Sequence, residues 1–416
     1  MPSCLNIALL TIIITAICAV SCRTVTTGQQ SNQSPQDVRF ASGQSALRIP
    51  FELSGNNIWL RGRVNESESL WFTIDTGASF SLINIRRAQE LGLQLESGHR
   101  TAGAGGSIES TRVAGITFRL PGVDIFNQTI AALSLDSLEP VEGHDFDVLL
   151  GYHFFSNFVV EIDYAARIIN LYDPQSYEYH GSGEIIPMAL KENRHPYIRA
   201  RIVQPGREPI EGEFEIDTGS GQTLILQSRF IAEHRLLRSG QRVIQAQGRG
   251  VGGAVPLPIS RITSFQLGRF AIENPLTVFA QSGAGRFAED GADGNIGNGI
   301  LRRFKVIFDY TRGRMILEPN ENFPEPSEYD MSGISLIAER PGFDVIRVER
   351  VLENSPAAEV GIKPQDIIVA ANSRPAAEIG LSGLREMFRL EGQEYRLSIK
   401  RGGELLLINL RTRRLI

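Results

Sequence analysis

Two aspartates in this chain follow apolar strand patterns, and each of them begins an Asp-Thr-Gly triplet. The first pattern, Trp71 to Ile74, ends in Asp75-Thr76-Gly77-Ala78, and the second, Phe214 to Ile216, ends in Asp217-Thr218-Gly219-Ser220. Two carboxylates held close together share one proton, because like charges at short range cannot both ionise easily. The ionised member can take a proton from water while the protonated member gives one to a carbonyl oxygen. The pair therefore predicts acid–base hydrolysis by a dyad whose two members titrate together, so the residues alone do not assign the acid and the base.

The residues that follow each aspartate suit this chemistry. Gly77 and Gly219 allow a tight turn that brings backbone N–H groups toward each carboxylate. Thr76 and Thr218 can hydrogen-bond across the seam between the two turns. A single Asp-Thr-Gly is better interpreted as an ordinary turn, so the hypothesis depends on the second copy.

The second copy belongs to an internal repeat that covers most of the chain. Each half shows an Ile-Pro pair, a strand pattern, the Asp-Thr-Gly turn, a Gly-x-Gly-Gly cluster and a closing block. In the closing blocks, Asp147 and Asp163 are separated by the same interval as Asp293 and Asp309. We therefore predict two similar lobes, residues 46–178 and 182–320.

Composition indicates how these lobes are built. The 41 glycines, and the lack of long helical patterns, favour a mainly β fold with many turns. A net charge of −5 without a long basic run argues against nucleic acid as a partner. The six histidines show no metal-ligand spacing, so no metal or other cofactor is expected. We interpret the histidines as surface or hydrogen-bonding residues.

The N-terminus predicts export. All three cysteines, Cys4, Cys18 and Cys22, lie within the first 22 residues, which excludes a disulfide framework. The apolar run 5–20 and the small residues before Cys22 resemble a bacterial lipoprotein signal over residues 1–22. That resemblance implies acylation of Cys22 and a lipid-anchored protein of the cell envelope, in the periplasm or at the outer membrane. Ala19 stands where leucine is usual, and ordinary signal cleavage is the alternative. Residues 23–45 are predicted to be a flexible linker.

Taken together, the motifs of both halves resemble the retropepsin-like aspartic proteases over roughly residues 48–318. The Asp75 turn has the retroviral form of the motif and the Asp217 turn has the pepsin form. Leu149-Leu150-Gly151 and Asn295-Ile296-Gly297 match the hydrophobic-hydrophobic-Gly element that supports each turn in that family. Asn295 departs from it, since an apolar residue is usual there. The resemblance implies that Asp75 and Asp217 are catalytic, with Thr76, Gly77, Ala78, Thr218, Gly219 and Ser220 supporting the dyad.

The two glycine clusters have competing interpretations. Residues 248–253 formally fit a dinucleotide-binding pattern, but Pro256 and Pro258 follow instead of a helix. The resemblance implies mobile hairpins, or flaps, that close over a bound extended peptide. Plain hairpins with glycine turns are the alternative. The flap residues would be Gly103, Gly105, Gly106, Gly250, Gly252 and Gly253.

Residues 332–416 resemble a small α+β PDZ domain of the kind attached to bacterial envelope proteases. Gly333, Ile334, Ser335 and Leu336 correspond to the loop that binds a peptide C-terminus. Backbone N–H groups in such a loop form an anion-binding nest, beside a strand edge that pairs with peptide. Gln365 and Ser335 depart from the usual glycines. The alternative is a domain that only packs against the lobes.

The fold expected is mainly β: two tandem retropepsin-like acid-protease lobes followed by the PDZ domain. The function expected is an aspartic endopeptidase, monomeric because both lobes lie in one chain, which acts on polypeptide substrates and binds peptide C-termini through the PDZ domain. A catalytically inactive envelope protein that binds peptides in the same groove is the alternative. The presence of both aspartates argues against it.

Overall fold

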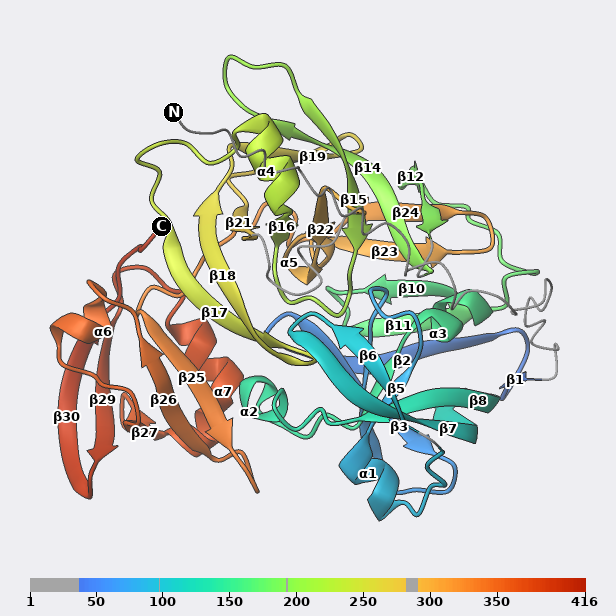
Figure 1. The fold of residues 1–416 in the computed structure, drawn as a ribbon, viewed down its shortest axis with the longest axis horizontal. Coiled ribbons are helices and arrows are strands. Elements are labelled where there is room, and N and C mark those ends of the chain that lie inside the picture. Colours follow the sequence, from blue (N-terminus) through green and yellow to red (C-terminus); the bar gives the residue numbers. More distant parts are fainter. Residues whose placement is uncertain (1–36, 97, 192–193, 282–290) are drawn as a thin grey trace, which may run out of the picture. The chain divides into compact units, whose positions relative to one another are not determined.

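The computed structural model describes residues 37–96, 98–191, 194–281 and 291–416, and Figure 1 shows their strands and helices. The fold is mainly β, as predicted. The expected signal segment, Cys22 and most of the expected linker lie outside the described residues. Residues Val38–Ile416 form one unit. No helix among the described residues is long and apolar enough to cross a membrane.

The first lobe is built from strands and three short helices. Its strands are β1 (Val38–Phe40), β2 (Ser45–Ser54), β3 (Asn57–Val64), β4 (Leu70–Ile74), β5 (Leu82–Asn84), β6 (Gly98–Gly103), β7 (Gly106–Leu120), β8 (Val123–Leu133), β9 (Val148–Leu150), β10 (Val159–Asp163) and β11 (Ile168–Tyr172). Its helices are α1 (Ile85–Glu90), α2 (Glu139–Glu142) and α3 (Tyr152–Asn157). β1 corrects the expected linker, because Val38–Phe40 pair with Val123–Ile125 of β8. Ordered structure therefore begins before residue 45.

The second lobe repeats this plan. Its strands are β12 (Glu184–Pro187), β13 (Ala189–Lys191), β14 (His195–Val203), β15 (Ile210–Ile216), β16 (Leu224–Leu226), β17 (Ile244–Gly250), β18 (Gly253–Arg261), β19 (Ser264–Leu267), β20 (Phe270–Glu273), β21 (Leu276–Phe279), β22 (Gly294–Ile296), β23 (Phe304–Asp309) and β24 (Arg314–Pro319). Its helices are α4 (Ser228–His234) and α5 (Asn298–Leu301). In β14 the buried Ile198, Ala200 and Ile202 alternate with exposed arginines, the period-two pattern of a strand with one face on the core.

Matching strands of the two lobes have matching partners. β4 pairs in parallel with β9, and β15 pairs in parallel with β22. β9 and β22 are in turn antiparallel to β5 and β16. The closing hairpins of the two lobes then join, because β10 pairs antiparallel with β23 and places Val160 opposite Phe308. One hydrophobic core runs through both lobes, and in it the rings of Phe155 and Phe308 lie 5.6 Å apart.

The C-terminal domain has its own core and its own sheet, in the order β25-β26-β27-β29-β30. Its strands are β25 (Ile334–Glu339), β26 (Val345–Val351), β27 (Ile367–Ala371), β28 (Arg374–Pro375), β29 (Glu394–Arg401) and β30 (Glu404–Arg411), and its helices are α6 (Pro356–Glu359) and α7 (Ala376–Met387). Gln365 adopts φ 75°, the left-handed conformation that explains why glycine is usual at this position. Leu415, at the end of the chain, packs into a cluster with Ile225 and Ile244 of the second lobe.

Candidate active site

The two Asp-Thr-Gly turns are held in the same way. Asp75 follows β4 and its N–H donates to Leu150 O at 2.9 Å, while Asp217 follows β15 and its N–H donates to Ile296 O at 3.0 Å. Each carboxylate then accepts the N–H of its own glycine: Gly77 N donates to Asp75 Oδ1 at 2.7 Å, and Gly219 N donates to Asp217 Oδ1 at 2.9 Å. Backbone amides thus orient both carboxylates before any substrate binds.

The two turns face each other at close range. A Cβ added to Gly77 would lie 2.9 Å from Asp217 Cγ, and a Cβ added to Gly219 would lie 2.3 Å from Asp75 Cγ. Each glycine is therefore needed because the opposite carboxylate occupies the space of a side chain. The structure brings Asp75 and Asp217 into one cleft, and this arrangement allows them to share a proton.

The two threonines tie the lobes together beneath the carboxylates. Thr76 N donates to Thr218 Oγ1 and Thr218 N donates to Thr76 Oγ1, both at 3.0 Å. Each hydroxyl also donates across the seam, Thr76 Oγ1 to Ile216 O at 2.6 Å and Thr218 Oγ1 to Ile74 O at 3.0 Å. Both side chains are fully buried. This reciprocal set of four bonds fixes the spacing of the two aspartates.

The residue after each triplet also has a matching role. Ala78 N donates to Asp75 O and Ser220 N donates to Asp217 O, each at 3.3 Å. Ala78 O accepts the N–H of Tyr152, and Ser220 O accepts the N–H of Asn298. These bonds connect each turn to the helix that follows its supporting strand.

Asn295 breaks the symmetry of the two lobes. In the parallel pair of β15 and β22 it lies opposite Glu215, and its Nδ2 donates to Asp217 Oδ2 at 2.8 Å. The matching residue in the first lobe is Leu149, which lies opposite Thr73 and has no side-chain donor. From the sequence, Asn295 was only a polar residue at a position where an apolar one is usual. In the structure its amide donates to a candidate catalytic carboxylate.

A further polar chain in the cleft was not predicted. His195, which is 1% exposed, contacts Ser79 Oγ through Nε2 at 3.0 Å and Glu215 Oε1 through Nδ1 at 2.9 Å. Ser79 belongs to the first lobe, whereas His195 and Glu215 belong to the second. The bonds therefore add a second tie across the cleft. Glu215 could have been found from its place two residues before Asp217, on the same face of the strand.

Two glycine hairpins form the roof of the cleft. Gly103 pairs with Gly106 at the tip of β6–β7, and Gly250 pairs with Gly253 at the tip of β17–β18. The tips meet, since Gly105 N donates to Val251 O at 2.8 Å. A Cβ on Gly105 would lie 2.3 Å from Gly253 N, so the close approach requires glycine. No helix follows the second cluster, which argues against the dinucleotide interpretation.

Two models of known protein families match parts of the chain. Residues 60–154 match the family model described as aspartyl protease, and residues 347–401 match that of the PDZ domain. The chain carries an aspartyl protease domain and a PDZ domain. The protease match includes Asp75 and Leu149-Leu150-Gly151, while the place of Asp217 follows from the structural repeat. No curated protein matches the chain.

In the PDZ domain, the predicted carboxylate-binding loop already holds a carboxylate. Asp330 Oδ1 accepts the N–H groups of Ser332 at 3.0 Å, Gly333 at 2.5 Å and Ile334 at 3.3 Å. Ser332 Oγ donates to the same oxygen at 2.8 Å. Burial raises the pKa of Asp330 to about 6, although these four hydrogen bonds favour its ionised form. Ser335 and Leu336 continue from this loop into β25.

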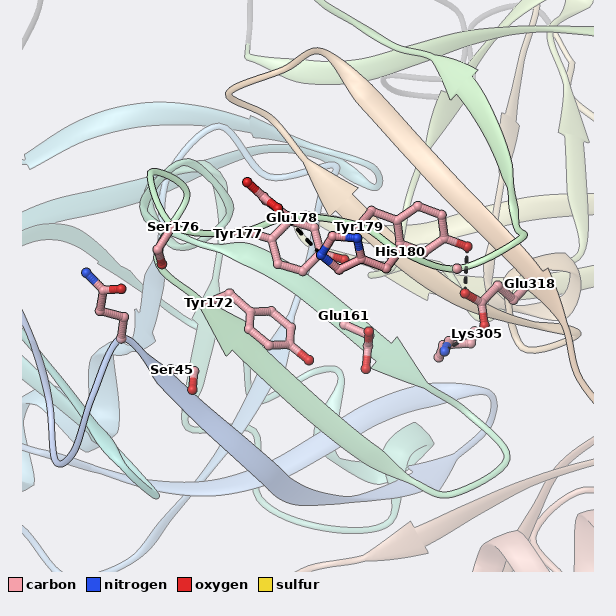
Figure 2. Close-up of a pocket in the computed structure, with 12 residues that line it drawn as sticks. Ser45, Glu161, Tyr172, Ser176, Tyr177, Glu178, Tyr179, His180, Lys305 and Glu318 are labelled. Atoms are coloured by element: carbon pink, nitrogen blue, oxygen red, sulfur yellow. Dashed lines mark hydrogen bonds and ion pairs between the residues drawn. The ribbon is translucent and has the colours of Figure 1, made fainter.

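A second pocket, whose lining does not include Asp75 or Asp217, is bordered by residues of β10, β11, β23 and β24 (Figure 2). The rings of Tyr172 and Tyr177 lie 4.9 Å apart between centroids and are tilted by 45°, and Tyr179 Oη donates to Glu318 Oε1 at 2.7 Å. Lys305 also pairs with Glu318, at 2.6 Å. Glu318 therefore pairs with both Tyr179 and Lys305 in this pocket. These contacts anchor the chain that connects the protease lobes.

Among the described residues, no group of three or more histidine, cysteine or acidic side chains is arranged to hold a metal ion. The carboxylates of Asp75 and Asp217 are each held by a backbone amide, that of Gly77 and that of Gly219.

Proposed function

We propose that this protein is an aspartic endopeptidase. The observation that carries the proposal is the pair of facing Asp-Thr-Gly turns, in which each glycine lies against the carboxylate of the other lobe. A water between Asp75 and Asp217 loses a proton to the ionised carboxylate and attacks the peptide carbonyl. The protonated carboxylate donates to the carbonyl oxygen, which gives a neutral tetrahedral intermediate.

The hydrogen bond from Asn295 supports a division of roles within the dyad. A donor to a carboxylate favours its ionised form, so Asn295 favours Asp217 as the base and Asp75 as the acid. The dyad still titrates as a pair. The flap hairpins β6–β7 and β17–β18 supply backbone edges against which an extended peptide can pair above the dyad.

Cleavage of a proteome-derived peptide library tests the proposal. New termini are identified by mass spectrometry at several pH values for the wild type, Asp75→Asn and Asp217→Asn. We expect termini that appear with the wild type alone, and their flanking residues define the preferred side chains. Identical libraries before and after incubation with the wild type would instead favour the binding protein without catalysis.

We also propose that the protein is exported, acylated on Cys22 and held in the cell envelope as a monomer. The apolar run 5–20 and the small residues before Cys22 support this proposal. Labelling with a fatty-acid analogue, compared between the wild type and Cys22→Ser, tests the anchor. Label retained by Cys22→Ser would contradict acylation of Cys22. The oligomeric state is measured separately, by light scattering of the detergent-solubilised protein.

The PDZ domain supports a role in peptide binding. We propose that this role concerns polypeptides brought to the cleft, in line with the strand edge and nest that PDZ domains offer to peptides.

A further inference from the structure

The peptide groove of a PDZ domain lies between an edge strand and a helix, here β25 and α7, with the carboxylate-binding loop at one end. β25 is the edge strand of the PDZ sheet, and β26 is its neighbour in the described residues. We call the space bounded by β25, α7 and residues 332–336 the PDZ groove. Three features of this groove bear on what can enter it.

The first feature is the loop. The N–H groups of Ser332, Gly333 and Ile334 already donate to Asp330, so a free C-terminal carboxylate would compete at this end of the loop with a carboxylate held by the chain itself. Two negative charges at one nest repel each other, which disfavours entry of the second. The loop is therefore poorly suited to the C-terminal peptide predicted from its sequence.

The second feature is the strand edge. Arg385, on α7, reaches across to β25 and donates from Nη2 to Leu336 O at 2.9 Å. A peptide pairing with β25 would have to compete for this carbonyl. The same guanidinium donates from Nη1 to Val141 O of α2 at 2.7 Å. Arg385 thus links the PDZ groove to the first protease lobe.

The third feature is the presence of lobe residues at the groove. A Cβ on Gly143, which ends α2, would lie 3.3 Å from Leu381 Cβ of α7, so the two backbones are in close contact. Arg340, just after β25, forms an ion pair with Glu139 and lies 3.3 Å from Asp145 Oδ1. Glu139 is fully buried. An internal segment with complementary charge therefore lies where a peptide ligand would bind.

We propose that the PDZ groove is a docking site for residues 138–143 of the chain's own first lobe, and that an external peptide enters only by displacing this segment. The PDZ domain would then influence the protease cleft of the same chain through this segment. The docking does not depend on catalysis, whereas its effect on cleavage rests on the proposed function.

The docked segment is also part of the cleft wall. Leu138, Val141 and Glu142 line the same cleft as the two aspartates. Arg249, on the second flap, donates to Ser137 O at 3.4 Å and forms an ion pair with Glu349 of β26. Displacement of 138–143 would therefore loosen one wall of the cleft, and Ser137, which contacts the flap, directly precedes the displaced segment.

Hydrogen exchange of the full chain tests the docking without any need for cleavage. In Arg340→Glu a like charge faces Glu139 and Asp145, so we expect amides 141–143 to exchange about five- to tenfold faster, the scale of one lost ion pair plus one new repulsion. Arg374→Glu is the matched control, since the side chain of Arg374 donates to Glu378 O within the PDZ domain. Arg340→Ala is the milder variant should the charge reversal fail to fold. Unchanged exchange at 141–143 in a folded Arg340 variant would overturn the proposal.

Peptide binding gives an independent readout. A pool of fluorescent heptapeptides with free C-termini is compared with the same pool carrying C-terminal amides, by polarisation. We expect the wild type to bind both pools equally weakly, and Arg340→Glu to bind both more tightly. A wild type that binds the free-carboxylate pool tenfold more tightly would show that the nest and the groove are open, and would overturn the proposal. This binding result does not require protease activity. The docking proposal and the proposed protease function can therefore fail independently of each other.

Discussion

Asn295→Leu gives the second lobe the residue that the first lobe has at position 149, and removes one donor from Asp217. A hydrogen bond to a charged group contributes about 1.5–3 kcal/mol. Since about 1.4 kcal/mol corresponds to one pH unit, we expect the acidic limb of the kcat/KM profile to move up by about one to two units. The direction follows because the lost amide stabilised the ionised carboxylate.

Stability should respond differently from activity. The Oδ1 of Asn295 is buried and has no hydrogen-bond partner among the described residues, so leucine removes an unsatisfied polar atom. We therefore expect the melting temperature of Asn295→Leu to stay level or to rise. Leu149→Met, a change of similar volume at the matching position, is the control and should leave the profile in place. An unshifted acidic limb in a folded Asn295→Leu protein would refute the reasoning.

Three further predictions concern the seam, the cleft wall and the roof. Thr218→Ala should lower the free energy of unfolding by about 2–4 kcal/mol, because it removes two hydrogen bonds and leaves the Thr76 N–H buried without the Thr218 hydroxyl as its acceptor. Thr218→Ser should restore most of this loss. Equal denaturation midpoints for the two variants would contradict the prediction. Burial raises the pKa of Glu142 from 4.5 to about 7. The protonated side chain therefore contributes stability that is fully present below pH 4.5 and is lost as the pH rises through 7. Glu142→Gln should therefore gain melting temperature relative to the wild type between pH 5 and pH 8, and a constant difference would count against it. Gly105→Ala places a methyl against Gly253 N, so peptide KM should rise while the melting temperature stays level; a KM equal to that of the wild type would show that the tips need not meet.

The features of the fold and the site that the sequence predicts have local causes. An Asp-Thr-Gly turn after an apolar strand, and a glycine cluster between two strand patterns, each specify their geometry within a few residues. The repeat then required the two turns to be equivalent. For this reason Asp75, Asp217 and both hairpins lie in one cleft as the sequence analysis expected.

Other features depend on partners distant in the chain. From the sequence, Asn295 was only a polar residue where an apolar one is usual, although the parallel register of β15 and β22 places it beside the strand that precedes Asp217. His195 contacts a serine of the other lobe, which no local pattern indicates. β1 is only three residues long and follows a polar stretch, so it was included in the expected linker; it is ordered because it pairs with β8.

In the PDZ domain, too, contacts between residues distant in the chain could not be predicted from local patterns. Its fold follows from local strand and turn patterns, and its core is separate from that of the lobes. Asp330, which accepts hydrogen bonds from this loop, lies just before the predicted loop residues 333–336, so the loop pattern did not include it. The contact of its groove with α2 joins residues more than 190 positions apart, as in the pair of Arg340 and Glu139.

The central claim is that Asp75 and Asp217 act as one unit. The most direct measurement is kcat/KM on a cleaved peptide for Asp75→Asn, Asp217→Asn and the double variant. Residues that act as a unit are strongly non-additive, so each single variant should lose about as much activity as the double variant. Losses that add on a logarithmic scale, or a single variant that keeps most of its activity, would contradict the shared dyad.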